Sequence, residues 1–128
     1  VDDPSRRVRA AAIDALRVRA DDGSWSRIEA RMNDDGEWPE VISAGIRFAR
    51  ERCLEVGVPT LTAVIERGRR PDAWAPDVDL AMAAIDALVA IGGAEAEATL
   101  TRAASESSPP PLRAAANSRE RVTQRCTR

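Results

Sequence analysis

A six-residue segment that occurs twice constrains the fold of this chain more than any other feature. Ala-Ala-Ile-Asp-Ala-Leu occupies residues 11–16 and returns unchanged at residues 83–88, 72 positions later. Residues 43–49 fit a middle copy, at shifts of 33 (Ile13 to Ile46) and 39 (Ile46 to Ile85). Residues 112–116 echo residues 8–12 and mark a fourth start. A period between 20 and 50 residues is typical of proteins built from stacked supersecondary units.

Each copy is expected to begin with a helix. A proline-containing turn precedes all four starts, and proline is tolerated in the first helical turn because its missing N–H has no helical partner there. Apolar residues then recur at helical spacing, as in Val8, Ala12, Ile13 and Leu16 of the first copy. Small residues share one aligned column, which predicts close approach between neighbouring helices: Ala12, Gly45 and Ala84.

The same two shifts predict a second helix in each copy. They align three columns that are mostly apolar, Trp25 with Val58 and Glu97, Ile28 with Leu61 and Leu100, and Met32 with Ile65 and Ala104. Ser24 is a plausible cap for the first of these helices. Loops rich in helix-breaking residues separate the copies at residues 33–36, 68–75 and 105–111. No segment reads as a strand.

Composition agrees with an all-helical fold. Hydrophobic residues make up 44% of the 128 residues, which is too many for a disordered chain. Aromatic residues make up only 3%, which argues against a β-sandwich or barrel. The net charge is −2, and every basic residue is arginine. A balance so close to zero does not indicate a nucleic-acid or anionic-membrane partner.

The two cysteines are expected to be free thiols. Cys53 and Cys126 are too few and too far apart for a disulfide framework or a zinc site. We expect Cys53 to be a small buried side chain and Cys126 an exposed thiol of the tail. No apolar run reaches membrane-spanning length and no signal peptide opens the chain, so a cytoplasmic location without membrane association is expected. Val1 in place of an initiator methionine leaves open a trimmed chain or part of a longer repeat array.

These motifs resemble the HEAT-repeat family, specifically the short bacterial HEAT-like repeats also found in phycobilisome lyases. The first-helix pattern of that family is matched by Asp3-Pro4, Val8-Arg9, Ala12-Ile13 and Ala15-Leu16, and its second-helix start by Gly57-Val58-Pro59 and Ile91-Gly92-Gly93. The resemblance covers residues 1–105. It implies an all-α, right-handed α-α superhelix, a HEAT-like solenoid of about seven helices in three to four helical-hairpin repeats.

The expected organisation is a single domain over residues 1–128. Its repeats span approximately residues 3–36, 37–75 and 76–108, and a terminal cap helix spans 109–125. The middle copy departs from the family pattern at Ile42, where an arginine is usual. In the last copy Asn117 and Glu120 occupy the columns of Ile13 and Leu16. A column that turns polar fits either a terminal cap or a frayed tail, and we favour the cap.

No catalytic or metal centre is expected. The acidic pairs at residues 2–3, 21–22 and 34–35 fall in loops or at helix starts, where aspartate caps helices and forms turns. The chain contains neither histidine nor lysine, so no serine or cysteine nucleophile is accompanied by a base. We therefore expect a protein that is not an enzyme and that uses no cofactor.

Arginine and tryptophan residues are the candidates for binding. The second helices usually line the concave face in solenoids of this family, and a polar stripe is expected there, composed of Arg27, Arg31, Thr60, Glu66, Thr99 and Arg102. The alternative is a solvated face with ion pairs to Glu29 and Glu66. Arg67, Arg69 and Arg70 are placed to complement a helix C-terminus.

The three tryptophans receive different predictions. Trp25 lies in an apolar column and is predicted to be in the core. Trp38 and Trp74 precede first helices, where an apolar residue before the cap can pack against the first turns as a hydrophobic staple. The alternative for both is an exposed anchor for a partner, because tryptophan is enriched at interface hot spots.

The sequence thus favours a non-catalytic scaffold that binds a protein or peptide on its concave face. The second hypothesis is a nucleic-acid-binding helical-repeat module that contacts phosphates through arginine. A third, a lyase-like subunit that attaches a chromophore, rests only on the family resemblance. An open solenoid end also permits self-association.

Overall fold

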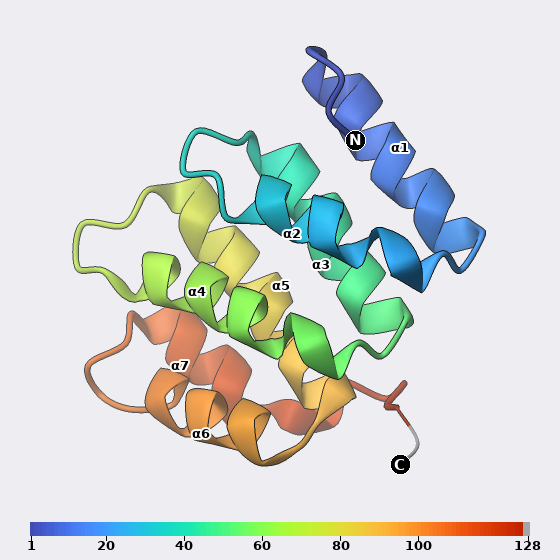
Figure 1. Ribbon diagram of the computed structural model, residues 1–128. Coiled ribbons are helices and arrows are strands. Elements are labelled where there is room, and N and C mark those ends of the chain that lie inside the picture. The colour runs from blue at the N-terminus through green and yellow to red at the C-terminus, as the bar shows by residue number, and fades with distance from the viewer. Residues whose placement is uncertain (127–128) are drawn as a thin grey trace.

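A computed structural model describes residues 1–126 of the chain. Within them the structure contains seven α-helices, three short 3-10 helices and no β-strand (Figure 1). The α-helices are α1 (Arg6–Val18), α2 (Trp25–Met32), α3 (Pro39–Glu51), α4 (Val58–Arg69), α5 (Ala75–Ile91), α6 (Ala94–Ala103) and α7 (Pro110–Asn117). Pairs of helices thus fall inside each expected repeat, and the prediction of an all-α fold is confirmed.

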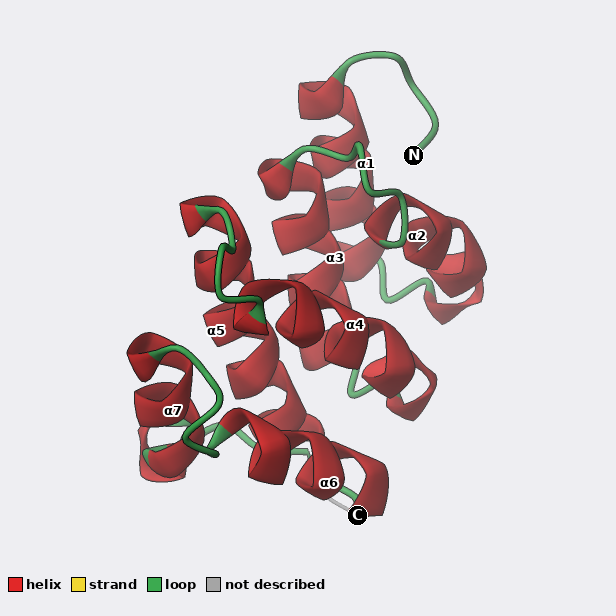
Figure 2. Ribbon diagram, turned by 90° about the vertical axis from the view of Figure 1, so that its left-hand side faces the viewer, coloured by secondary structure: helices red, strands yellow, loops and turns green. Residues whose placement is uncertain are grey.

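The helices form two layers (Figure 2). In one layer α1, α3, α5 and α7 lie side by side, each packed on the next. In the other layer α2, α4 and α6 follow one another across the first. The chain alternates between the layers, so residues that are one repeat apart in sequence become neighbours within a layer.

Backbone conformation repeats with the same shifts as the sequence. Ala20, Cys53 and Gly92 follow the first helix of successive copies and all have positive φ, at 57°, 52° and 73°. Their separations are the 33 and 39 positions that align the copies. A residue in this region commonly ends a helix, and non-glycine residues adopt it rarely. The first two turns are alike, because the amides of Asp21 and Leu54 donate to carbonyl oxygens five residues earlier, whereas Gly92 is itself the C-cap of α5 and donates to Leu88.

The core lies between the two layers. The aligned isoleucines Ile13, Ile46 and Ile85 are all buried, as the repeat predicts. Trp25 is also in the core, where its ring stacks on Phe48 with centroids 6.3 Å apart. Val8 is an exception, because 48% of it is exposed. It belongs to α1, which within residues 1–126 packs on only one helix of its layer, α3.

Two glycines bring helices close together. Gly45 of α3 faces the side chain of Met32, and a Cβ built at residue 45 would lie 2.5 Å from the Met32 sulfur. Gly68 of α4 faces α5, where a Cβ would lie 2.4 Å from Cβ of Ala81 and 2.8 Å from the carbonyl oxygen of Asp77. The prediction of close approach at Gly45 is confirmed. The tighter approach at Gly68 had no counterpart in the sequence reasoning.

The C-terminal segment differs from the prediction of a helix over residues 109–125. Helix α7 ends at Asn117, whose side-chain amide donates back to the carbonyl oxygen of Arg113 at 2.9 Å. A single 3-10 turn, Arg119–Arg121, follows and contacts Asp86 of α5, and the chain then continues toward the C-terminal end of α5. Val122 is buried there, and the amide of Cys126 donates to the carbonyl oxygen of Ala90 at 2.8 Å. The segment is packed rather than frayed, but it covers α5 as irregular chain.

The prediction of two free thiols is wrong. Cys53 and Cys126 form a disulfide across a sequence separation of 73, with their Cα atoms 5.9 Å apart. Cys53 is exposed in the turn after α3, and Cys126 is half-buried. Sequence distance was a poor guide, because the tail returns to the end of α3 after α5, α6 and α7 have been completed. The disulfide therefore links the last described residues to the middle of the chain.

No helix within residues 1–126 combines the length and the apolar character needed to cross a membrane.

Candidate binding surface

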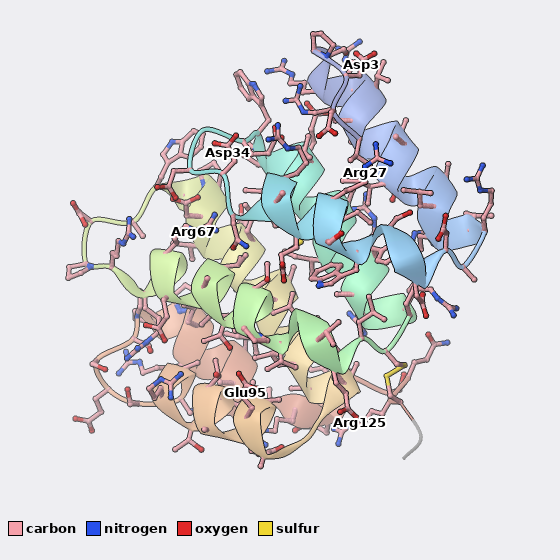
Figure 3. All side chains as sticks on the ribbon, viewed as in Figure 1. Asp3, Arg27, Asp34, Arg67, Glu95 and Arg125 are labelled. Carbon is pink, nitrogen blue, oxygen red and sulfur yellow. A yellow bond between two sulfur atoms is a disulfide. The ribbon has the colours of Figure 1, made fainter. Side chains whose placement is uncertain are left out.

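Arg27 and Arg31 of the predicted stripe lie on α2 and face the N-terminal segment (Figure 3 labels Arg27). Both are within 3.8 Å of the carboxylate of Asp2. Arg31 also lies 3.7 Å from Asp34 and 3.8 Å from Glu37. Their charges are thus balanced by carboxylates of the same chain, none of which is the predicted partner Glu29.

Thr60 and Thr99 are buried, so the prediction that they belong to an exposed stripe is wrong. The Thr60 hydroxyl donates to Glu29 of α2 at 3.2 Å, and Thr99 of α6 shares a 2.9 Å hydrogen bond with Thr62 of α4. Arg27 of this column is exposed as predicted, but the two threonines each face the preceding helix of the same layer. These threonines hold α2, α4 and α6 together, and neither is accessible to a partner.

Glu66 and Arg102 form a separate cluster on α4 and α6. The Glu66 carboxylate lies 3.6 Å from Nε of Arg102 and 2.9 Å from Arg69. Arg102 also donates to Thr99 at 3.2 Å. The predicted pairing of arginine with Glu66 is confirmed. The structure thus divides the predicted stripe into two ion-pair clusters with buried threonines between them. Isolated pairs of this kind at a protein surface contribute little to stability.

A buried ion pair that sequence reasoning missed joins α1 to the loop before α3. The side chain of Glu37 is 1% exposed and accepts two hydrogen bonds from Arg9, at 2.6 and 3.0 Å, and one from the amide of Trp38 at 2.9 Å. The hydrogen bond from Arg9 to Glu37 raises the pKa of the Arg9 guanidinium above its ordinary value. Residues 9 and 37 share no helical spacing, so no sequence pattern connects them.

Trp38 and Trp74 are not staples. Each is itself the N-cap residue of its helix, with extended backbone, and its carbonyl oxygen accepts the first helical hydrogen bonds. The side chains point away from the core and are 49% and 60% exposed. The Arg6 guanidinium lies over the Trp38 ring, 3.9 Å from its centroid. The sequence left open a staple or an exposed anchor at these two positions, and the structure shows that both rings are exposed.

Both tryptophans line one surface depression, which we call the Trp groove. It consists of three adjoining pockets of about 220, 250 and 280 Å³ that share lining residues. The loop between α2 and α3 and the loop between α4 and α5 meet at this end of the molecule (Figure 1). The groove is lined by residues 35–40, Ile42, Ser43, Arg67, Arg70, Trp74, Pro76, Asp77, Asp79, Leu80 and Ala83.

The groove combines apolar walls with charged edges. Pro39, Pro76 and Leu80 contribute apolar surface beside the indole rings. Arg67 is held by a hydrogen bond to the carbonyl oxygen of Met32 at 2.9 Å, at the end of the molecule where Figure 3 labels Arg67 and Asp34. Apolar surface with a few convergent polar groups is the usual make-up of a ligand site. The arrangement provides contact area and charge, and no nucleophile beside a base.

The acidic pairs act both locally and at a distance, since Asp2 faces Arg27 and Arg31 and Asp22 accepts from Arg52 at 2.8 Å. Asp3 and Asp34 accept hydrogen bonds from the amides of Ser5 and Gly36, each at 2.9 Å, and so stabilise turns. The side chain that caps α1 is that of Ser5, whose hydroxyl accepts from the amide of Val8. Ser24 occupies the cap position of α2 without a capping hydrogen bond from its side chain. The prediction of turn formation is confirmed, but no aspartate of these pairs caps a helix through its side chain.

Comparison with protein-family models, curated proteins and solved structures finds no match to this chain.

Proposed function

We propose that this protein is a non-catalytic module that binds a peptide segment of a partner protein in the Trp groove. The observation that carries the proposal is a pair of exposed rings in one groove. Trp38 lies at the start of α3 and Trp74 at the start of α5, and both line the same pocket. Large aromatic side chains supply much of the energy of protein interfaces and are enriched at their centres. Two of the three tryptophans of this chain are exposed at the same place, where an unoccupied groove would leave their apolar surface in water.

We also propose that the two helical layers form a HEAT-like solenoid, a right-handed superhelix with repeats near residues 3–36, 37–75 and 76–108. The alternation of the chain between layers and the positive φ at the aligned residues Ala20, Cys53 and Gly92 support this proposal. In such an array each hairpin buries its apolar face only by stacking on its neighbours. The array then serves as a rigid support for the loops that form the groove.

The face formed by α2, α4 and α6 is a weaker candidate than the groove. Its arginines, Arg27, Arg31 and Arg102, already have carboxylate partners, and a ligand would have to displace them. For the same reason, contacts to phosphates of nucleic acid have little support on this face. The chromophore-lyase hypothesis has no observation in its favour.

The disulfide bears on the cellular location. Disulfides form and persist in oxidising compartments and are rare in the cytosol. The cytoplasmic expectation rested on the lack of a membrane-spanning run and of a signal peptide, and it did not anticipate that Cys53 and Cys126 are bonded. We therefore propose that the protein matures in an oxidising compartment. Mass spectrometry after alkylation of the natively produced protein, with and without prior reduction, tests this, and two alkylated cysteines without reduction would contradict it.

Selection from a random peptide library on the immobilised protein tests the proposed function. We expect peptides that bind the wild type and lose binding to the Trp38→Ala, Trp74→Ala double variant. A matched control is Val18→Ala, which truncates an exposed apolar side chain on α1 outside the groove. Binders that are retained by the double variant but lost on Arg27→Glu, Arg31→Glu would place binding on the second helices and refute the groove. Circular dichroism of every variant confirms that the helices are retained.

A further inference from the structure

The chemistry of the Trp groove indicates which peptide it accepts. Resting on the proposed peptide-binding function, we infer that the groove binds an extended, proline-containing segment with basic side chains, one of which lies over the ring of Trp74. The inference follows from the free face of the Trp74 ring, the unpaired charges, and the N–H donor that proline removes from each of the two helix starts.

The two rings differ in what covers them. The guanidinium of Arg6 lies 3.9 Å from the centroid of Trp38 and is held there by Glu40, 2.9 Å from its Nε. Within residues 1–126 no cation lies over Trp74, which is the more exposed of the two rings. A cation over an indole face gains energy from the ring quadrupole. The ring of Trp74 can therefore bind a cationic side chain of a partner, as the ring of Trp38 binds Arg6 within the chain.

Unpaired charges in the groove are predominantly acidic. Asp35, Asp77 and Asp79 line it, and none of their carboxylates has a hydrogen-bond or ion-pair partner among the residues that the structure describes. Arg70 likewise lacks a partner in that part of the chain, and Arg67 donates only to a backbone carbonyl oxygen, so three carboxylates face two uncompensated guanidinium groups. Glu37 and Glu40 are neutralised by Arg9 and Arg6 and do not alter this balance. The excess of carboxylate favours a cationic ligand.

The helix starts in the groove are poor sites for an anion. The N-terminus of a helix binds phosphate through free N–H groups. Here Pro39 begins α3 and Pro76 lies in the first turn of α5. Each helix therefore has one free backbone N–H fewer at its start. Glu40 and Asp77 add negative charge to the same turns. A phosphorylated or acidic segment would meet these carboxylates and find its charged donors only in Arg67 and Arg70, whereas a basic segment meets the carboxylates as complementary charge.

The apolar features favour an extended proline-containing backbone. Proline-rich segments adopt the polyproline II helix, which leaves its carbonyl groups free, and they dock into grooves lined by aromatic rings. Trp38 and Trp74 provide such rings, and neither indole N–H has a hydrogen-bond partner within residues 1–126. Both are therefore free to donate to peptide carbonyls. Pro39, Pro76 and Leu80 provide apolar surface between the rings for the pyrrolidine groups.

Fluorescence anisotropy with labelled synthetic peptides tests this inference. The probe is a peptide of repeated Pro-Pro-Arg triplets, compared with repeated Pro-Pro-Glu and Gly-Gly-Arg triplets of equal length. We expect Pro-Pro-Arg to bind at least about tenfold more tightly than either comparator. We expect Trp74→Ala to weaken it by about tenfold or more, as at an interface hot spot. Asp35→Asn combined with Asp79→Asn should weaken it by several fold and reduce its dependence on salt.

Two controls keep the result interpretable. Asp72→Asn removes the same charge from the loop between α4 and α5, but Asp72 does not line the groove, so binding should be unchanged. Circular dichroism and the thermal midpoint confirm that each variant is folded. Equal binding of the arginine and glutamate peptides would overturn the basic specificity, and equal binding of Gly-Gly-Arg would overturn the extended proline backbone. Failure of all three peptides would overturn the inference as a whole.

The two proposals fail in different ways. If the library yields binders that depend on Trp38 and Trp74 but contain neither proline nor basic residues, the groove is the binding site and the inferred ligand is wrong. If no binder depends on these tryptophans, the proposed function itself is wrong. Binding of Pro-Pro-Arg that survives Trp74→Ala would place the peptide elsewhere and refute the inference.

Discussion

Replacing Gly68 with alanine places a methyl group between α4 and α5. The ideal Cβ position lies 2.4 Å from Cβ of Ala81 and 2.8 Å from the carbonyl oxygen of Asp77. Both neighbouring atoms belong to the body of α5 and neither can rotate away. The helices must therefore separate, or α4 must shift along α5. Gly45→Ala is the matched comparison, because there the added Cβ meets only the flexible side chain of Met32.

Two opposing effects determine the magnitude. Alanine is favoured over glycine in a helix interior by about 1 kcal/mol. Overpacking a well-packed interface costs about 1–3 kcal/mol, and the rigid neighbours of Gly68 place it toward the upper end. We expect Gly68→Ala to lower the free energy of unfolding by about 1–2 kcal/mol, or the thermal midpoint by about 4–8 °C. For Gly45→Ala the two effects nearly cancel, because methionine can adopt another rotamer.

Chemical denaturation followed by circular dichroism measures both variants. The double variant Gly68→Ala, Ala81→Gly removes the Cβ contact but retains the contact with the Asp77 carbonyl. It should therefore recover part of the loss, with a coupling energy of at least about 0.5 kcal/mol. A Gly68→Ala variant as stable as the wild type would show that α4 and α5 are not in this close contact. A larger loss for Gly45→Ala than for Gly68→Ala would refute the argument from rigid and flexible neighbours.

Three further predictions concern the disulfide, the buried ion pair and pH. Reduction of Cys53–Cys126 should lower the free energy of unfolding by up to about 4 kcal/mol, because it frees a loop with a sequence separation of 73; a denaturation midpoint unaffected by reductant would contradict this. Glu37→Gln should lower the thermal midpoint by several degrees and by more than Glu51→Gln, since Glu37 is buried against Arg9 whereas the partner of Arg17 is exposed; equal shifts in differential scanning calorimetry would count against the role of burial. Stability should change little from about pH 6 to about pH 8, because the chain has no histidine and its cysteines are bonded. Hydrogen bonds to carboxylates raise several arginine pKa values; their contribution is present below the ordinary arginine pKa and is lost only as the pH rises through the folded value in strong alkali. A marked change in urea midpoint within the neutral range would contradict this prediction.

The helices were predictable because their signals are local. Proline and turn residues mark the starts of the first helices, and apolar residues recur at the helical period in each copy. The aligned isoleucines at 13, 46 and 85 are buried as the repeat requires. Val8 departs from this pattern, since it occupies the position of a core residue and is nevertheless 48% exposed. It is exposed because, among the described residues, α1 packs on α3 alone within its layer.

The candidate site was less predictable because it depends on orientation. Thr60 and Thr99 were correctly placed on second helices but wrongly on the exposed side, since the sequence does not specify how far each helix is rotated toward its neighbour. Trp38 and Trp74 were recognised as either staples or anchors. Only the structure shows that each occupies the cap position itself, which turns its ring away from the first turns of its own helix.

By itself the sequence determined that the chain is all-helical, together with the order of its helices and the identity of most of the core. These properties depend on neighbours within one or two helical turns and on a repeat that can be aligned by inspection. The tertiary structure alone decided which distant residues meet: the disulfide between Cys53 and Cys126, the ion pair of Arg9 and Glu37, and the convergence of two loops into the Trp groove. The physical reason is that such contacts depend on the accumulated rotation and translation between helices, which small adjustments at every interface determine and no local spacing records.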